Sequence, residues 1–419
     1  MLIRFEVSNF RSIAEPVELS MVAIDRDRDA ARDQPRLGES LLTRAAVYGP
    51  NASGKSNLLA AITWLRDAVE LSLREWGDDI PVEPFRLGAE QSGSSEFVLE
   101  AMIDGVRFEY ALEIGPQAVI YEALFHYPER KRRRIFEREG LRLTLQRGLG
   151  ALSGTRELLT DRTLALSVAR RFDEPSVTRF SDEVIRIRSQ GVRSNSHGSL
   201  LAKLRGWVDG QFDIWHVGRY GPVDDASLAE REKAVAMLRL ADLGIEDVEV
   251  VDGPFRLPDS IASSTASLRL LHKSAVGRTA FELREESEGT RTWFGLIPSV
   301  LTALRHGSLM VFDELDASLH PTLSAELLRL FADPTINPHG AQLVFTSHDT
   351  SLLNHLNRDE VWLTEKRPDG STRLGALADF AGERVRRSQN LENAYLHGRF
   401  GALPQLDQTE LLRALGLIG

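Results

Sequence analysis

The segment that most constrains this sequence is the glycine-rich run 49–56, which reads Gly-Pro-Asn-Ala-Ser-Gly-Lys-Ser. It matches the phosphate-binding pattern G-x-x-x-x-G-K-[ST] at every fixed position. An apolar run at 45–48 precedes it, and apolar residues at helical spacing follow it from 58 to 73. Because a P-loop must connect a buried strand to the N-terminus of a helix, this context supports the motif. The sequence therefore predicts a triphosphate-binding loop.

Each position of this run has a chemical role. Glycines let successive backbone N–H groups face the phosphates, and the helix N-terminus adds a partial positive charge. Lys55 is expected to reach the terminal phosphates, and the Ser56 hydroxyl is expected to ligate Mg²⁺. The predicted nucleotide-binding residues, with ATP and Mg²⁺ as cofactors, are Gly49, Asn51, Ser53, Gly54, Lys55, Ser56 and Asn57.

A second motif, at 308–314, is an apolar strand that ends in two carboxylates. An isolated pattern of this kind is common, but it becomes specific when it follows a P-loop in the same chain. We expect Asp313 to hold Mg²⁺, directly or through water, and Glu314 to polarise the attacking water.

A third apolar strand, at 342–346, is followed by Ser347, His348 and Asp349. A histidine just beyond a strand is, taken alone, more often a structural residue. Here it is the third element in a fixed order, at the place where a γ-phosphate sensor would lie. We therefore predict that His348 senses the γ-phosphate.

The fourth element is the run 286–290, which precedes a helical pattern from Trp293 to Leu304. Ser287 and Gly289 at a helix N-terminus form another anion site. The P-loop already cradles one triphosphate, so this second site suits the nucleotide of a second molecule.

The remaining pattern divides the chain. Strand-like alternation at 97–103 and 106–114 flanks Asp104-Gly105, a strong hairpin signal, and further strand-like runs lie at 119–125, 134–138 and 141–145. Residues 24–40 are polar and are predicted to form a loop. Helical patterns follow at 158–172, 199–208 and 228–240, and strands return near 267–270 and 280–283.

Taken in order, these motifs resemble the Walker A, signature, Walker B and switch-histidine elements of ABC ATPases. Residues 9–12, 49–57 and 313–321 are similar to the SMC/RecF/OLD branch of that superfamily. Residues 287–290 and 346–349, with the tail 390–404, resemble the bacterial AAA_21-type (AAA-fifteen) ATPases. The resemblance covers about residues 1–125 and 240–405.

This resemblance implies an α/β fold, an ABC-type P-loop ATPase head with a β-rich N-terminal lobe and an inserted helical region. The expected parts are an N-terminal ATPase lobe (1–150), a helical insertion (151–265) and a C-terminal ATPase lobe (266–419). Two heads are expected to enclose two ATP molecules, in a homodimer or a higher homo-oligomer. Asp316, in the D-loop-like stretch, is added to the nucleotide-binding residues. No Q-loop glutamine is assigned; Gln91 lies in a plausible region, but 91–95 is more typical of a flexible loop.

The resemblance also implies a role in anti-phage defence of the abortive-infection (RloA/AbiL-like) type. About 70 residues follow His348, too few for the C-terminal Toprim domain of OLD nucleases, so a separate Toprim-type (RloB-like) nuclease or effector is the expected partner. The signature differs from the Leu-Ser-Gly-Gly-Gln form of transporters, which argues against a transport role. Two alternatives are a RecF-like DNA-repair ATPase that binds DNA and a nucleotide-locked scaffold with little turnover.

Composition limits the function further. The net charge of −10 is opposite to that of a dedicated DNA binder, and the dense basic run at 130–134 is predicted to be a hairpin edge or, alternatively, a phosphate- or partner-contacting patch. The chain has no cysteine, which excludes disulfides and thiolate chemistry. No run of about 18 apolar residues is present, so we expect a cytoplasmic protein without a membrane segment.

Overall fold

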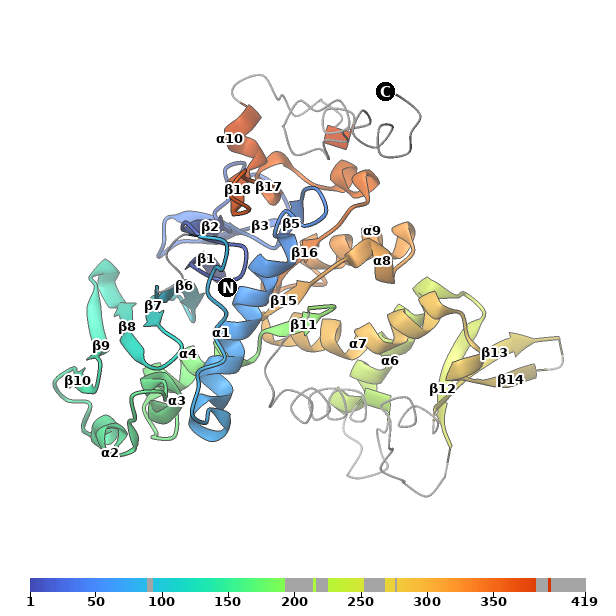
Figure 1. The fold of residues 1–419 in the computed structure, drawn as a ribbon. Coiled ribbons are helices and arrows are strands. Elements are labelled where there is room, and N and C mark those ends of the chain that lie inside the picture. Colours follow the sequence, from blue (N-terminus) through green and yellow to red (C-terminus); the bar gives the residue numbers. More distant parts are fainter. Residues whose placement is uncertain are drawn as a thin grey trace, which may run out of the picture.

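The computed structural model describes residues 1–88, 93–192, 214–215, 225–251, 268–275, 277–381 and 391–392. Two large sheets lie on either side of the long helix α1 (Lys55–Glu75), as Figure 1 shows. Apolar residues of α1 share one core with both sheets. Three predictions, the helical pattern at 199–208, the candidate Gln91 and most of the tail 390–404, lie outside the described residues.

The first sheet is antiparallel and has seven strands in the order β10-β9-β8-β7-β6-β1-β2. Asp104 (φ 49°) and Gly105 (φ 73°) form the tight turn between β6 and β7 that the sequence predicts. The predicted β-rich N-terminal lobe is therefore confirmed. Its strands are β1 (Leu2–Ser8), β2 (Val17–Ser20), β6 (Ser95–Ile103), β7 (Val106–Ile114), β8 (Val119–Tyr127), β9 (Arg133–Glu139) and β10 (Arg142–Leu145).

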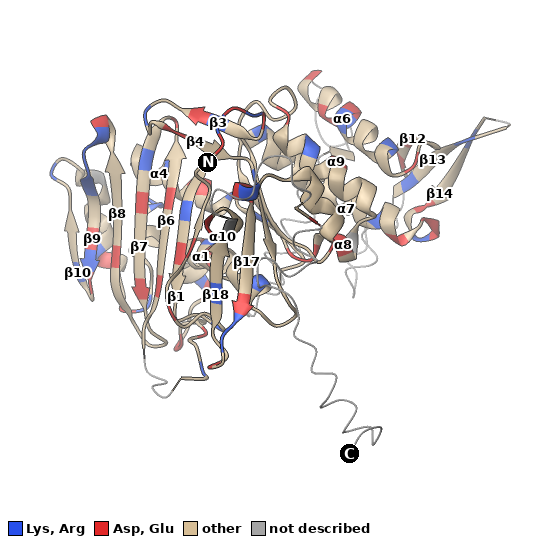
Figure 2. Cartoon of the chain, turned by 90° about the horizontal axis from the view of Figure 1, so that it is seen from above, with Lys and Arg blue, Asp and Glu red and all other residues tan. Residues whose placement is uncertain are grey.

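The basic run lies at the start of β9 on this sheet, where charges of both signs are interspersed (Figure 2). Arg132 pairs with Glu109 at 2.6 Å, and Arg134 pairs with Glu137 at 2.7 Å. The Arg132 guanidinium also lies 3.6 Å from the centroid of the Phe125 ring. These contacts are those of a solvated hairpin edge, the first of the two interpretations of this run.

The second sheet has six strands in the order β11-β15-β16-β5-β17-β18, parallel except for β18. Alternate residues of its central strands face opposite cores: Ala45 and Val47 pack with α1, whereas Ala46 and Tyr48 pack with α7 and α9. A sheet buried on both faces requires nearly continuous apolar strands, which is the pattern of the sequence. The elements are β5 (Arg44–Tyr48), β11 (Arg188–Gln190), β15 (Leu309–Phe312), β16 (Gln342–Thr346), β17 (Val361–Lys366), β18 (Thr372–Ala376), α7 (Glu288–His306), α8 (Leu315–Ser318), α9 (Pro321–Ala332) and α10 (Leu377–Ala381).

The segment after β10 differs from the prediction. The helices are α2 (Thr155–Leu158), α3 (Ala165–Ala169) and α4 (Pro175–Ile185). Of the helix predicted at 158–172, only the short α3 forms, since α2 ends at Leu158. The Thr160 hydroxyl accepts hydrogen bonds from the backbone N–H groups of Arg162 and Thr163 and stabilises a turn between the two helices. α3 and α4 pack on α1, and β11 joins the parallel sheet. The beginning of the predicted helical insertion, up to residue 192, therefore packs with the N-terminal lobe and the central sheet.

A smaller unit extends beside α7. Helix α6 (Asp225–Ala241) packs along α7 and confirms the helix predicted at 228–240. Next to it lies an antiparallel sheet of β12 (Ile245–Val250), β13 (Leu268–Ser274) and β14 (Gly277–Glu282), whose β13–β14 hairpin projects from the molecule in Figure 1. This sheet contains both strands predicted in this region. Among the described residues, no helix is long and apolar enough to span a lipid bilayer.

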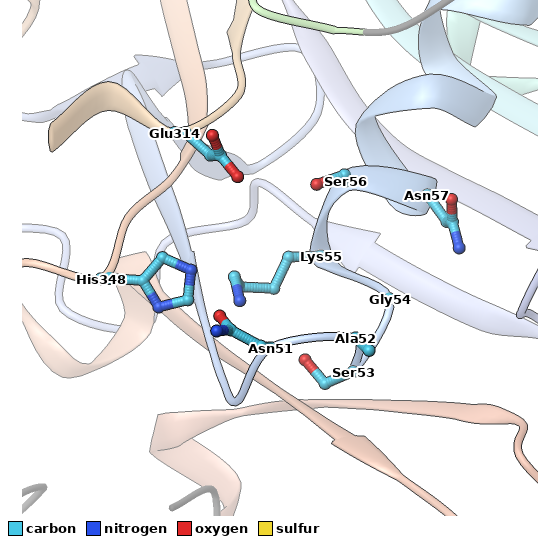
Figure 3. Close-up of a pocket in the computed structure, with 9 residues that line it drawn as sticks. All are labelled: Asn51, Ala52, Ser53, Gly54, Lys55, Ser56, Asn57, Glu314 and His348. Atoms are coloured by element: carbon cyan, nitrogen blue, oxygen red, sulfur yellow. The ribbon is translucent and has the colours of Figure 1, made fainter. Parts of the chain in front are cut away.

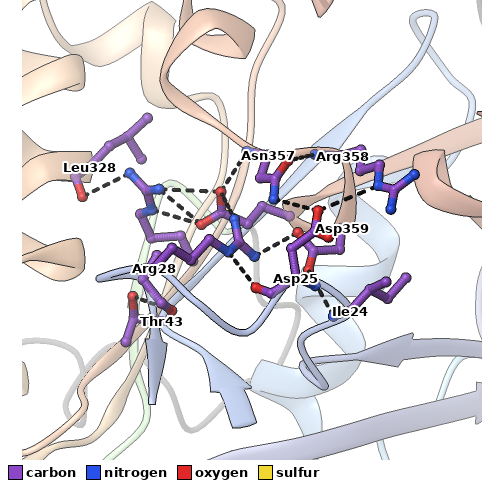
Figure 4. A network of polar contacts seen from close by, with 11 residues as sticks. Ile24, Asp25, Arg28, Thr43, Leu328, Asn357, Arg358 and Asp359 are labelled. Carbon is purple, nitrogen blue, oxygen red and sulfur yellow. Dashed lines mark hydrogen bonds and ion pairs between the residues drawn. The ribbon is translucent and has the colours of Figure 1, made fainter. Parts of the chain in front are cut away.

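Residues 24–40, predicted as a loop, contain the hairpin of β3 (Ala31–Gln34) and β4 (Glu39–Leu42). The ion-pair network in Figure 4 fixes the chain before this hairpin to the C-terminal lobe. Arg28 donates to Asp359 at 2.6 Å and to Glu360 at 3.0 Å, and Arg44 pairs with Glu360 at 2.9 Å. Both carboxylates are buried, so they need these partners. Since Arg44 begins β5, the network also holds the strand that leads to the P-loop.

Candidate nucleotide-binding site

The predicted P-loop connects β5 to α1, and two of its glycines are sterically required. Gly49 has φ 153° and Gly54 has φ 103°, a backbone region that other residues rarely adopt. A Cβ atom at Gly49 would overlap with Thr364, and one at Gly54 would overlap with the Thr372 hydroxyl. Thr364 and Thr372 belong to the β17–β18 pair, so close packing of these two strands against the loop requires glycine at both positions.

The loop forms one wall of a pocket of about 480 Å³ at the carboxyl ends of the parallel strands (Figure 3). In the figure the Lys55 side chain points into the pocket between Asn51, Glu314 and His348. The structure thus brings together residues from three segments far apart in sequence. The pocket is lined by Asn51, Ala52, Ser53, Gly54, Lys55, Ser56, Asn57, Glu314 and His348.

Lys55 supplies the positive charge of the P-loop. Its Nζ atom donates to the carbonyl oxygens of Gly49 at 2.9 Å and Pro50 at 3.0 Å. Burial lowers the pKa of Lys55, while the charges of Asp313 and Glu314 raise that pKa and so oppose the shift. An ammonium group with only carbonyl acceptors in a partly desolvated place gains strongly from phosphate oxygens.

Ser56 and Asp313 form the predicted metal-binding pair. The Ser56 hydroxyl donates to Asp313 Oδ1 at 3.0 Å, and the Thr346 hydroxyl donates to the same oxygen at 2.6 Å. The Asp313 residue is buried, with 7% of its surface exposed. A hydroxyl and a carboxylate oxygen in direct contact beside the phosphate loop fit Mg²⁺, which prefers oxygen ligands and completes its shell with phosphates and water.

Glu314 differs from Asp313 in exposure and in backbone conformation. Its φ of 55° and ψ of 57° lie in the left-handed region, and its N–H donates to the Thr346 hydroxyl at 2.7 Å. This conformation is costly for a non-glycine residue and is typical of functional sites. Its exposed carboxylate lines the pocket, so it can accept a proton from water.

His348 follows β16 and presents an exposed imidazole to the same pocket. Its backbone N–H donates to Asp316 Oδ1 at 3.0 Å. Asp316 is not one of the residues that line the pocket, and within this chain it instead fixes the turn that bears His348. Direct contact between Asp316 and nucleotide remains a prediction.

The structure does not bring Ser287 and Gly289 into this pocket. Ser287 caps helix α7, and its hydroxyl accepts from Thr290 N–H at 3.1 Å. A Cβ atom at Gly289 would meet only the Ser287 hydroxyl, at 3.9 Å, so this chain does not require a glycine there. Their contact with the nucleotide of a second molecule stays a prediction.

One candidate residue was missed by the sequence analysis. Gln190 ends β11, the neighbour of β15, and its carbonyl oxygen accepts from Asp313 N–H at 2.9 Å. The strand end thus places the half-buried residue Gln190 beside Asp313 through a backbone contact, although Gln190 is not among the residues that line the pocket. The only signal was a three-residue strand, too short for alternation to be recognised.

Three solved structures show a distant likeness to this chain. An SMC head bound to the C-winged helix domain of ScpA has a TM-score of 0.45 and 12% identity, over 90% of this chain and 97% of that chain. The SMC head domain from Thermotoga maritima has a TM-score of 0.41 and 15% identity, over 90% and 98% of the two chains. An SMC head from Pyrococcus furiosus, bound to the C-terminal domain of ScpA, has a TM-score of 0.41 and 14% identity, over 90% and 97%. No curated protein matches the sequence.

A family comparison is decisive. Residues 44–354, most of the chain, match the AAA_21 family model, which is described as "AAA domain, putative AbiEii toxin, Type IV TA system". The matched range begins with β5 and ends after His348, so it includes every motif that forms the pocket. The chain therefore belongs to the AAA_21 family of AAA-domain proteins, as the motifs predicted.

Proposed function

We propose that this protein binds MgATP in the P-loop pocket and hydrolyses it. The observation that supports this best is the convergence of Lys55, Glu314 and His348 on one pocket, beside the Ser56–Asp313 pair. In this reaction a water oxygen bonds to the γ-phosphorus while the bond to the β,γ-bridging oxygen breaks. Glu314 accepts the water proton, and Lys55 and His348 stabilise charge on the γ-phosphate. Mg²⁺ neutralises phosphate charge when it is held by Ser56 and Asp313.

The direct test is phosphate release by the purified protein with and without Lys55. Lys55→Ala is expected to abolish both ATP binding and turnover, because it removes the cation that lies in the pocket. Calorimetry with ATP and a phosphate-release assay check the two effects. Undiminished ATP affinity in the variant would contradict the assignment.

Gln190→Leu is expected to slow hydrolysis about tenfold and to raise the Mg²⁺ concentration required. Leucine keeps the size of the side chain but removes the amide oxygen, a hard ligand for the metal or its water. Turnover measured across a Mg²⁺ titration checks this. Gln117→Leu is the control, since Gln117 is exposed and donates to Asp79 at 2.7 Å, away from the pocket. An unchanged Mg²⁺ dependence would remove Gln190 from the site.

His348→Ala is expected to reduce turnover about tenfold or more while ATP affinity changes little. The imidazole is one of several groups around the phosphates, so its loss affects charge stabilisation in the transition state more than binding. Steady-state kinetics with ATP and calorimetry with ATP and ADP separate the two. If turnover, ATP affinity and ADP affinity all equal those of the parent protein, His348 does not sense the γ-phosphate.

We further propose that ATP binding closes two heads on each other and that closure signals to a separate effector in anti-phage defence. Closure is a suitable output because contacts between the γ-phosphate and a second head exist only in the closed, ATP-bound state. The family description names a "putative AbiEii toxin" and a "Type IV TA system", which supports the defence role. A phage-infection assay with the protein and its genomic neighbours tests this. Protection that is lost in Lys55→Ala cells supports the role, and equal phage yield with and without the genes contradicts it.

A further inference from the structure

The carboxylate of Glu392, which plays no part in the proposed reaction, contacts the short helix that follows His348 in the sequence. The 3₁₀ helix η5 (Thr350–His355) begins two residues after His348. Glu392 accepts a hydrogen bond from the Thr350 hydroxyl at 3.2 Å and another from the Asn354 side-chain amide at 2.8 Å. Each oxygen of Glu392 thus receives one hydrogen bond from η5.

An apolar contact fixes Glu392 in this place. The preceding residue, Leu391, is only 8% exposed and belongs to the same core as Leu352 and Leu353 of η5. The Leu391–Glu392 pair therefore combines a buried side chain in the core that also contains η5 with two hydrogen bonds from η5 to a charged acceptor. Such hydrogen bonds are stronger than those between neutral groups.

The turn that bears His348 depends on its backbone contacts. His348 N–H donates to Asp316 at 3.0 Å, Asp349 N–H donates to the Ser347 hydroxyl at 3.0 Å, and the Tyr48 hydroxyl donates to Asp349 O at 2.9 Å. The imidazole itself is exposed and has no hydrogen-bond partner among the described residues. Its position is therefore set by the turn, and the turn continues directly into η5.

One carboxylate oxygen of Asp349, in the same turn, lacks a hydrogen-bond donor among the described residues. Asp349 accepts from Ser351 N–H at 2.9 Å through one carboxylate oxygen, whereas its other oxygen is buried and receives no hydrogen bond from any residue that the structure describes. A buried oxygen without a donor is costly, so a small shift that supplies one would be favourable. Such a shift competes with the observed conformation of the turn. A contact from outside the turn is therefore needed to keep the turn in that conformation.

We propose that Glu392 is a positioning residue, which acts through Thr350 and Asn354 to hold the turn that presents His348 to the γ-phosphate. This inference rests on the proposed role of His348. It gives Glu392 an effect on the rate of hydrolysis, although Glu392 does not line the nucleotide pocket. Loss of its two hydrogen bonds to η5 would slow hydrolysis without closing the pocket.

The kinetic test is Glu392→Ala. Turnover is expected to fall about tenfold, the change that the loss of one hydrogen bond to a charged acceptor produces, while the KM for ATP stays within about twofold. Glu326→Ala is the matched control. Glu326 lies on α9, which also packs against η5, but within the described part of the chain its hydrogen bonds come from Arg329 and not from η5. A parental kcat in Glu392→Ala, or an equal loss in the control, overturns the proposal.

A donor–acceptor exchange distinguishes positioning from a loss of stability. Asn354→Asp places a carboxylate against Glu392 and is expected to reduce kcat about as much as Glu392→Ala. Adding Glu392→Gln lets the new amide donate to the new carboxylate, so the double variant is expected to recover to within about threefold of the parent. A double variant no more active than Asn354→Asp contradicts the proposal, because the reversed hydrogen bond then has no effect on the switch.

Amide hydrogen exchange separates this proposal from the proposed ATPase function. Glu392→Ala is expected to accelerate exchange of the backbone amides of 347–356 about tenfold, with no change in the P-loop helix α1. Hydrogen exchange can be measured without ATP hydrolysis, so this test remains valid even if the protein binds ATP without hydrolysing it. If exchange at 347–356 is unaltered, the positioning role fails, whereas an inactive parent or a fully active His348→Ala protein would instead defeat the proposed function.

Discussion

Glu314→Gln is expected to keep ATP binding, to lose turnover by about 10²–10⁴-fold and to accumulate the closed, ATP-bound assembly. Gln has nearly the same shape as Glu but cannot accept the proton of the attacking water. The carboxylate is exposed to the pocket, while the N–H of the same residue is held by the Thr346 hydroxyl at 2.7 Å. The substitution therefore removes the base without disturbing the backbone that places it. Single-turnover kinetics and light scattering with ATP check the two effects.

The distinction between Asp313 and Glu314 sharpens this experiment. Asp313→Asn alters an oxygen that accepts from both Ser56 and Thr346, so it is expected to weaken Mg²⁺ binding and distort the strand end. Glu314→Gln should show neither effect. Glu326→Gln, at a half-buried position of α9 that does not line the pocket, controls for the loss of one charge. If Glu314→Gln hydrolyses ATP at the parental rate, the base is a different group.

The parts of the candidate site that are formed by residues close together in the sequence could be predicted from the sequence alone. The P-loop could be predicted because its spacing is fixed by the backbone geometry of phosphate binding, and Glu314 and His348 could be predicted because each follows an apolar strand. The structure places all three at one pocket. The antiparallel lobe was equally accessible, since its strands alternate with a period of two residues and are joined by Asp104-Gly105.

Features that depend on long-range pairing were not accessible. Gln190 lies next to Asp313 only because β11 pairs with β15, more than a hundred residues away. The packing of α3 and α4 on α1 likewise could not be read from local patterns, which show that a helix is amphipathic but not which partner its apolar face contacts. The hydroxyl of Thr160 interrupts a helical pattern that apolar spacing alone predicts to be continuous.

The second large effect concerns the two-molecule site. Gly289 lies at the N-terminus of α7, and a Cβ atom there would meet only the Ser287 hydroxyl, at 3.9 Å. Gly289→Arg should therefore fold normally and keep the α7 cap, yet block a phosphate that approaches from another chain. We expect this variant to bind ATP through its own P-loop but to lose nearly all hydrolysis. Circular dichroism and calorimetry establish the fold and the binding, and a phosphate-release assay gives the turnover.

Mixing two inactive variants then tests whether the site is shared. A Lys55→Ala chain retains its Gly289, and a Gly289→Arg chain retains its Lys55, so a mixed dimer has one intact composite site and one doubly altered site. Random pairing makes about half of the dimers mixed, and one of two sites in each is whole, so about a quarter of parental activity should return if sites act independently. Mixing Lys55→Ala with Lys55→Met is the matched control, because no pairing restores the lysine. An active Gly289→Arg protein, or full parental turnover by a monomer at high dilution, would show that the α7 N-terminus is not needed by a second chain. Mixed dimers that are proven by mass but remain inactive would show instead that both sites must act together.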